Sequence, residues 1–347
     1  MLRVDGAQKS GSGTIVRTAV ALAALLGEEL EVFNVRAKRD KPGLRPQHLK
    51  AVEAVAELCR GRLSGASVGS RKLRLTPGGP PRGGEFTWDI GTAGSTTMLA
   101  LCVLPVAAFA NGPCVFRIKG GLFQDFAPSA FHTKYVLLPA LRAMGLEAEL
   151  EIVRPGYVPK GGGIIELKVE PLSGPLRPFR REALHGDLRF WGIALSSHLK
   201  GRKVSERMAK RCQEVLGRRG IQADFNVLYD ETAVQPGAAL ALFVQDRNGC
   251  ALGADRAGAP RRPAEEIGET TARILLEDLD SGATVDRHLA DQLIPYAALA
   301  KGESEFLIPQ VTDHVEANLW LVEELLGAKY ELSGNRLHIE GIGYERC

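Results

Sequence analysis

Apolar and polar residues follow two rhythms along the chain, one typical of helices and one typical of strands. A strand is predicted over residues 2–5, and a glycine-rich turn connects it to a helix over residues 14–26. A strand over residues 29–35, a long loop, a helix over residues 49–59 and two strand-like segments follow. Together these elements form a first α/β unit.

The order helix, strand, loop, helix, strand and strand returns twice further along the chain. The second copy is predicted at residues 95–110, 114–118, 119–128, 130–144, 147–153 and 164–169. The third copy is predicted at residues 288–300, 305–308, 309–313, 314–326, 328–332 and 336–339. Such units cannot bury their sheet faces alone, so they pack against one another. We therefore predict an α/β (α+β) fold whose large domain contains three repeated units, each of two helices and four strands.

The spacing breaks between the second and third copies. Two segments there, residues 174–181 and 258–263, are rich in Pro and Arg or in Gly, Pro and Arg. Between them lies a shorter α/β pattern, with a strand at residues 188–195, a helix at 205–216 and strands at 223–228 and 239–245. This pattern indicates a small inserted domain. We expect residues 1–183 to hold repeats 1 and 2, residues 184–261 the insert, and residues 262–347 repeat 3. A helix over residues 264–279 should return the chain to the large domain.

Composition is that of an ordinary soluble protein of 347 residues, with 45% hydrophobic and 24% charged residues. A net charge of +3 is mild, but the basic cluster at residues 36–41 leaves room for a phosphate-bearing partner. Six cysteines without a C-x-x-C pair suggest reduced thiols and a cytoplasmic location. The longest apolar run, residues 98–110, contains Pro105 and is too short to span a bilayer, so no membrane role is expected.

His314 lies where a predicted strand gives way to a predicted helix, and it is the candidate nucleophile. Asp313 followed by Glu316 resembles a capping box at the start of that helix. Free N–H groups and the positive dipole end there attract phosphate and disfavour protonation of an imidazole, so a neutral nitrogen would face a polyphosphate. A histidine that merely helps to cap its helix is the alternative.

The glycine-rich segment at residues 6–13 is a weaker phosphate signal. Glycines allow positive φ and close approach of the backbone to a ligand, but the pattern is neither G-x-G-x-x-G nor a Walker A loop. A plain strand-to-helix turn explains this segment equally well.

A set of short motifs follows the same order and spacing as in a known family. The motifs are Asp5-Gly6-Ala7-Gln8, Arg17, Arg36-Ala37-Lys38-Arg39, Lys41-Pro42-Gly43-Leu44, Gln47-His48-Leu49, Thr92-Ala93-Gly94-Ser95, Lys119-Gly120-Gly121, Ala127-Pro128, Gly156-Tyr157-Val158-Pro159-Lys160-Gly161-Gly162-Gly163, Asp291-Gln292-Leu293 and His314. With them the sequence resembles the RNA 3′-terminal phosphate cyclase family almost from end to end. The glycine-rich run at residues 156–163 and the Asp-Gln-Leu before the histidine are the most diagnostic.

The resemblance implies a large domain of three repeated units, a small inserted domain and an ATP-dependent reaction on an RNA 3′-phosphate. His314 matches the family residue that carries AMP covalently. Pro128, Asp291 and Gln292 match positions that line the adenosine pocket, and His288 stands where that pocket usually has a tyrosine. Polar positions that would hold phosphates are matched by Arg17, Arg36, Arg39 and Gln47. ATP, a divalent metal (Mg or Mn) and RNA with a 3′-phosphate end are the implied cofactors and partner; no metal ligand and no oligomeric state are predicted.

The sequence also departs from the family pattern. Lys9-Ser10 stands where Gly-Glu is usual, so a carboxylate associated with metal is missing; Leu101 replaces a glutamine that contacts the nucleotide, and Pro155 replaces an Arg or His. These departures keep open a non-catalytic or altered-substrate relative that acts in RNA processing or ribosome assembly. An enolpyruvyl transferase, built on similar α/β repeats, is a further alternative that rests on fold analogy alone.

Overall fold

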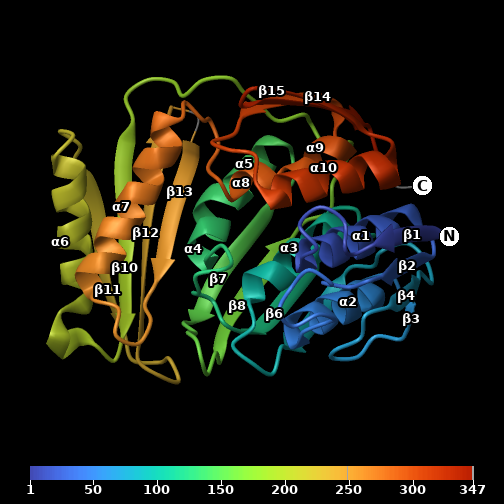
Figure 1. Ribbon diagram of the computed structural model, residues 1–347, viewed down its shortest axis with the longest axis horizontal. Coiled ribbons are helices and arrows are strands. Elements are labelled where there is room, and N and C mark those ends of the chain that lie inside the picture. Colours follow the sequence, from blue (N-terminus) through green and yellow to red (C-terminus); the bar gives the residue numbers. More distant parts are fainter. Residues whose placement is uncertain (248, 346–347) are drawn as a thin grey trace.

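The computed structural model describes residues 1–247 and 249–345, and Figure 1 shows their arrangement. Three four-stranded sheets share one topology, in which two strands run parallel and the next two are antiparallel. The first sheet has the order β1 (Leu2–Asp5), β2 (Leu30–Phe33), β4 (Leu73–Thr76), β3 (Arg62–Ser64). The second has the order β5 (Gly84–Asp89), β6 (Cys114–Gly120), β8 (Gly163–Val169), β7 (Ala148–Arg154). The third has the order β9 (Arg180–Arg181), β14 (Lys301–Leu307), β16 (Arg336–Ile342), β15 (Lys329–Ser333). The predicted fold class with three repeated units is therefore confirmed.

Two of the strands that open these sheets, β5 and β9, were not predicted. β9 has two residues and lies inside the segment that the sequence suggested was a linker. It pairs in parallel with β14, as β1 pairs with β2 and β5 with β6. The insert therefore interrupts the third unit after its first strand.

The helices of the three units pack against one another in the middle of the molecule. They are α1 (Gly13–Leu26), α2 (Pro46–Leu58), α3 (Thr96–Ala108), α4 (Ala130–His132), a π-helical segment η1 (Thr133–Leu137), α5 (Leu138–Ala143), α8 (Leu289–Gln292), α9 (Ile294–Leu299) and α10 (Asp313–Leu326). α1 contacts α2, α3 and α10, so a helix of the third unit lies against the first. The helix expected over residues 288–300 is two short helices, because Pro295 at the start of α9 has no N–H to continue the preceding turn.

The inserted domain is the left-hand part of Figure 1. Its sheet has the order β11 (Ala223–Asp230), β10 (Arg189–Ser197), β12 (Gly237–Asp246), β13 (Gly249–Ala257), of which β13 was not predicted. A short 3₁₀ turn, η2 (Lys200–Arg202), precedes α6 (Val204–Gly217), and α7 (Ala264–Asp280) follows the sheet.

α7 was expected to return the chain to the large domain, and its packing shows otherwise. It lies beside α6 and against β12 and β13. Its apolar face, which includes Ile267, Leu275 and Leu276, joins the core of the small sheet, because that sheet offers the nearest apolar surface to bury it. We therefore propose that the inserted domain extends through α7 rather than ending at residue 261.

Two expectations from composition can be compared with the structure. Cys59, Cys102, Cys114 and Cys212 are free and buried, as expected of reduced thiols. The side chain of Cys250 and the whole of Cys347 lie outside the described part of the chain. Among residues 1–247 and 249–345, no helix is both long enough and apolar enough to cross a bilayer.

Candidate active site

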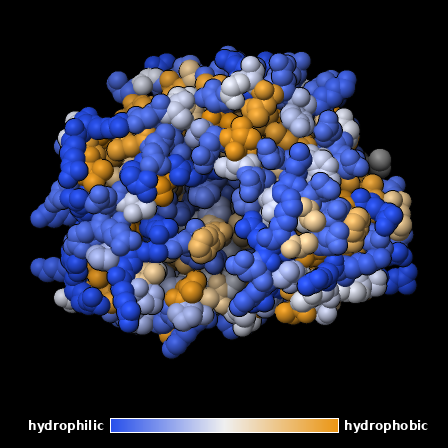
Figure 2. Space-filling view, viewed as in Figure 1, coloured by the Kyte–Doolittle hydropathy of each residue, from blue (hydrophilic) through white to orange (hydrophobic). Residues whose placement is uncertain are grey.

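A cavity of about 450 Å³ opens where the three units meet, and all nine of the predicted site residues line it. Arg17, Arg36, Arg39 and Gln47 come from the first unit, Pro128 from the second, and His288, Asp291, Gln292 and His314 from the third. Figure 2 shows a hollow with a largely hydrophilic rim between the inserted domain and the rest of the molecule. The structure thus gathers into one place residues that are up to about 300 positions apart in the chain.

His314 is the second residue of α10, at the positive end of the helix dipole. The helix is capped by Thr312, whose hydroxyl accepts a hydrogen bond from the Val315 N–H at 3.2 Å. The predicted capping residue, Asp313, is instead the first residue of the helix. His314 therefore does not provide the cap, and its ring lies among residues of the cavity wall.

Two hydroxyl groups at the start of α1 hold one side of the His314 ring. Nδ1 lies 3.1 Å from Thr14 Oγ1 and 3.5 Å from Ser12 Oγ. Ser12 is also the N-cap of α1, and its hydroxyl lies 2.8 Å from that of Ser10. Among the described residues Nε2 has no hydrogen-bond partner, so this nitrogen is the one available to a ligand.

Burial lowers the pKa of His314 to about 4, and the positive charges of Arg17 and Arg39 act in the same direction. The imidazole is therefore neutral at physiological pH. When Nδ1 carries the proton and donates to Thr14, the lone pair of Nε2 is free for nucleophilic attack.

Three arginines give the cavity its positive charge. Arg17 donates to Thr14 Oγ1 at 3.2 Å, and removal from water lowers the pKa of its guanidinium. Arg36 donates to the carbonyls of Lys41 and Gly43 at 2.7 and 3.0 Å, so part of this guanidinium shapes its own loop. Arg39 is exposed and has no ion pair among the described residues. Arg17 and Arg39 are thus the arginines with most donors left for an anion.

Gln47 and His48 begin the next helix at the cavity wall. Gln47 Oε1 accepts from the Ser95 N–H at 2.9 Å and so ties the start of α3 to α2. His48 packs over Gly13, where a Cβ would lie only 2.1 Å from His48 Nε2. Burial lowers the pKa of His48 to about 2, so this ring is also neutral.

Another part of the lining is more apolar and contains Pro128, Met98, Leu101 and Pro105. Two buried polar atoms there, Gln292 Oε1 and Tyr296 Oη, have no hydrogen-bond partner among the described residues. Burial raises the pKa of Asp291 to about 7, against the charge of Arg17 that lowers it. Unpaired buried polar groups carry a desolvation cost that a ligand could remove.

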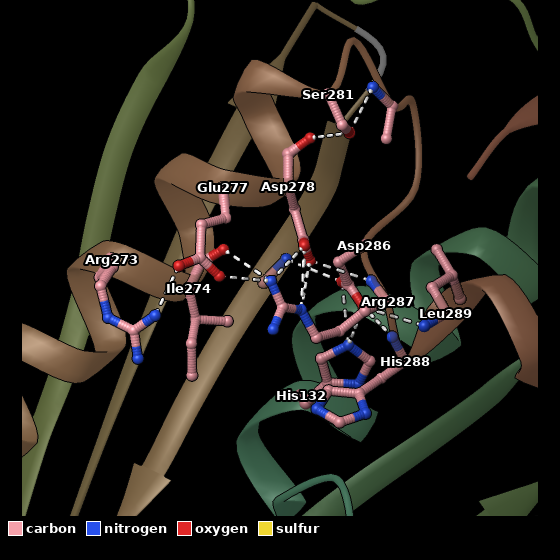
Figure 3. A network of polar contacts seen from close by, with 12 residues as sticks. His132, Arg273, Ile274, Glu277, Asp278, Ser281, Asp286, Arg287, His288 and Leu289 are labelled. Atoms are coloured by element: carbon pink, nitrogen blue, oxygen red, sulfur yellow. Dashed lines mark hydrogen bonds and ion pairs between the residues drawn. The ribbon is translucent and has the colours of Figure 1, made fainter. Parts of the chain in front are cut away.

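A buried ion pair positions His288 and the segment that precedes Asp291 (Figure 3). The carboxylate of Asp286 contacts His132 Nε2 at 3.0 Å through both oxygens and accepts from the N–H groups of His288 and Leu289 at 2.9 Å. It also accepts from the Gly253 N–H on β13 at 2.8 Å. One carboxylate thus joins the second unit, the third unit and the inserted domain.

Several cavity residues were not predicted from the sequence. Ser12 and Thr14 lie where the sequence indicated a glycine-rich turn into a helix with a weak phosphate signal, and His48 belongs to a motif to which no role was assigned. Phe126 and Asp125 lie in the loop before Pro128 and also line the cavity. The N-cap position of Ser12 was the available signal, because it places two hydroxyls at a helix N-terminus.

Comparisons with known proteins identify the family of this chain. The family described as RNA 3′-terminal phosphate cyclase matches residues 8–332. The chain belongs to this family of ligase-type enzymes. The resemblance stated from the motifs is therefore confirmed.

Curated relatives of this cyclase family span nearly the whole chain. A protein of Nitrosospira multiformis named RNA 3′-terminal phosphate cyclase is 39% identical over 96% of this chain and 94% of its own length. Relatives with the same name from Methanopyrus kandleri and Hyperthermus butylicus are 37% and 38% identical and cover 96% and 99% of the chain, with 96% and 99% of their own length matched. An enolpyruvyl transferase from Streptomyces tendae aligns with a TM-score of 0.22 and 10% identity over 98% of this chain and 82% of its own, which supports no conclusion about that alternative.

Proposed function

We propose that this protein converts an RNA 3′-terminal phosphate into a 2′,3′-cyclic phosphate at the expense of ATP. The observation that carries the proposal is the neutral His314, held through Nδ1 at a cationic cavity with Nε2 unengaged. Membership of the cyclase family supports the same reaction.

In the first step, Nε2 of His314 attacks the α-phosphorus of ATP. A phosphorus–nitrogen bond forms, the bond to the bridging oxygen breaks, and pyrophosphate leaves. Thr14 Oγ1 would accept a hydrogen bond from the Nδ1–H group and so stabilise the positive charge that develops on the ring. Arg17 and Arg39 would balance the negative charge on the phosphates, aided by the N-termini of α1 and α10.

In the second step, an oxygen of the RNA 3′-phosphate attacks the phosphorus of the histidine adduct. The phosphorus–nitrogen bond breaks, the imidazole is released, and the RNA end carries AMP through a new anhydride. The neighbouring 2′-hydroxyl then attacks the 3′-phosphorus and loses its proton, and AMP leaves with the electrons of the broken anhydride bond. The transfer of AMP to the RNA end gives the 3′-phosphorus a good leaving group, AMP, in place of an unactivated phosphate oxygen.

The residues that line the cavity support ATP as the ligand. Arg17, Arg36, Arg39 and Gln47 would bind the phosphates, and Pro128, His288, Asp291 and Gln292 would enclose the adenosine. The unpaired Gln292 Oε1 and Tyr296 Oη offer polar contacts for the base or the ribose. Four free, buried thiols are consistent with the cytoplasmic location that we propose.

The same residues do not form a metal site by themselves. Within the described part of the chain, no group of three or more His, Cys, Asp or Glu side chains could hold an ion. Ser10, at the place of the missing carboxylate, is a buried neutral hydroxyl bonded to Ser12. A Mg²⁺ or Mn²⁺ ion would therefore need the phosphate oxygens of ATP for most of its ligands.

Incubation with ATP radiolabelled at the α-phosphate tests the proposal. We expect a covalent protein–AMP adduct that is labile in acid and stable in base, and its absence in His314→Ala. His338→Ala, a histidine on β16 outside the cavity, is the matched control and should retain the adduct. An adduct that persists in His314→Ala, or a wild-type protein that forms none, would contradict the proposal.

A further inference from the structure

A second cavity, of about 750 Å³, lies between the large domain and the inserted domain. One wall is the loop of Tyr157, Val158, Pro159 and Lys160, which belongs to the most diagnostic glycine-rich run of the sequence but does not line the first cavity. This loop is fixed to the inserted domain, because the Lys160 N–H donates to Gln235 Oε1 at 3.0 Å and Gln235 Nε2 donates to the Val158 carbonyl at 2.7 Å.

The wall of this cavity is strongly cationic. Among the described residues, those that line it include five Lys or Arg side chains and no carboxylate: Lys160, Arg202, Arg207, Arg261 and Arg262. Arg207 is paired with Glu265 at 2.8 Å and Arg262 with Asp125 at 2.7 Å. The other three, Lys160, Arg202 and Arg261, are exposed and have no ion pair within residues 1–247 and 249–345. A cluster of unpaired cations in a cavity attracts a polyanion.

The two cavities are neighbours. Asp125 lines the first cavity and Arg262 the second, and the two side chains form a bidentate ion pair with distances of 2.9 and 2.7 Å. Next to Asp125 on the rim stands Phe126, whose residue surface is 96% exposed. An aromatic ring held in water beside a cationic cavity is the arrangement by which proteins stack the bases of a single strand.

We propose that the nucleotides that precede the RNA 3′ end run from the first cavity over Phe126 into the second cavity. The inference rests on the proposed function, which puts the terminal phosphate beside His314. Phe126 would stack one base near the end, and Lys160, Arg202 and Arg261 would bind the backbone phosphates further upstream. Contacts to phosphates and to ring faces do not distinguish one base from another, so the groove binds single-stranded RNA with little sequence preference.

Direct binding to the full chain tests this groove without the need for catalysis. Fluorescence anisotropy would compare a 3′-phosphorylated mononucleotide, used as a competitor, with a labelled single-stranded oligoribonucleotide that ends in a 3′-phosphate. The wild type should bind the oligonucleotide at least about tenfold more tightly. Lys160→Ala/Arg202→Ala/Arg261→Ala should lose most of this advantage, and the slope of log affinity against log salt should fall by about 2, because three cations no longer neutralise phosphates.

The matched control removes the same charge elsewhere. Arg71, Lys210 and Arg218 are exposed and line neither cavity, so the Arg71→Ala/Lys210→Ala/Arg218→Ala variant should keep the advantage of the longer RNA. Phe126→Ala should weaken binding of the oligonucleotide by about tenfold without a change in the salt slope, because the substitution removes a stacking surface and no charge. Should the triple variant lose its fold, the single Arg202→Ala variant replaces it, with a slope lower by about 0.7.

The proposed RNA path is wrong if the triple variant prefers the oligonucleotide over the mononucleotide as strongly as the wild type does. It is also wrong if the wild type binds the mononucleotide as tightly as the oligonucleotide. Failure of the proposed function has a different signature. In that case the wild type forms no AMP adduct on His314, whatever the binding of RNA shows.

Discussion

Replacement of Thr14 by valine isolates what its hydroxyl does for His314. Valine keeps the shape and volume of the side chain but removes the oxygen that lies 3.1 Å from His314 Nδ1 and accepts from Arg17 at 3.2 Å. The nitrogen that carries the proton of a neutral histidine is set by the hydrogen bond of the other nitrogen. With only Ser12 Oγ left beside Nδ1, at 3.5 Å, the proton occupies Nε2 more often, where it blocks the nucleophilic lone pair.

The size of the effect follows from the two hydrogen bonds that valine cannot make. Each contributes about 1 kcal/mol net, and the Arg17 donor left without its acceptor adds a desolvation cost of similar size. These costs add up to about 3 kcal/mol, but Ser12 remains beside Nδ1 and only part of the cost falls on the transition state. We therefore expect the barrier to adenylylation to rise by about 1.4 to 2.8 kcal/mol, which slows the reaction by about 10- to 100-fold. Thr14→Ser keeps the hydroxyl and should react at close to the wild-type rate.

Single-turnover formation of the AMP adduct measures this rate, and ¹⁵N NMR of His314 reports which ring nitrogen carries the proton. Thr14→Val should slow the reaction at every pH and shift the proton towards Nε2. Its pH at half-maximal rate should stay low, because burial, Arg17 and Arg39 still lower the pKa of the ring. Adduct formation at the wild-type rate in Thr14→Val, or an equal loss in Thr14→Ser, would refute a role for the hydroxyl.

As the pH is lowered, the adenylylation rate should fall only near pH 4, where His314 becomes protonated. In Arg39→Ala a neighbouring positive charge is gone, so the pKa of His314 and the fall in rate should move to higher pH, which pH–rate profiles of both proteins measure. Arg39→Ala should also weaken turnover of 3′-phosphorylated RNA to the same degree for every terminal base, since it contacts phosphate, and a base-dependent loss in steady-state kinetics would contradict this. Gly13→Ala should lower the free energy of unfolding in a urea titration by about 1–3 kcal/mol through its clash with His48, whereas Gly201→Ala, with nothing within 4 Å, should change it little. Asp286→Asn should lower the free energy of unfolding by about 3–5 kcal/mol, because buried His132 loses its counter-charge. Burial alone would raise the pKa of Asp286, but His132 lowers it to about 2. In urea titrations the wild type should therefore lose this stabilisation as the pH falls from about 4 towards 2, whereas the variant has none to lose.

The sequence by itself determined the repeated units and nine of the residues that line the cavity. Helical and strand periodicity is a local property, so it located α1, α3, α6 and α10 to within a few residues. The cyclase motifs made it possible to name site residues from the sequence, and His314, Arg17 and Asp291 all line the cavity. The predicted helix N-terminus at His314 was located correctly, and the phosphate site that it suggested stays a prediction.

Tertiary packing alone decided the rest. β9 is too short and too charged to show a strand pattern, and only its pairing with β14 reveals it. The apolar face of α7 fits either domain as sequence, and the nearest uncovered sheet decided where it packs. Thr14 stands 300 residues from His314, and their hydrogen bond exists only because α1 and α10 lie side by side. The cationic cluster of the second cavity could not be predicted from the sequence, because its cations come from both domains and come together only when a loop of one domain is fixed against the other.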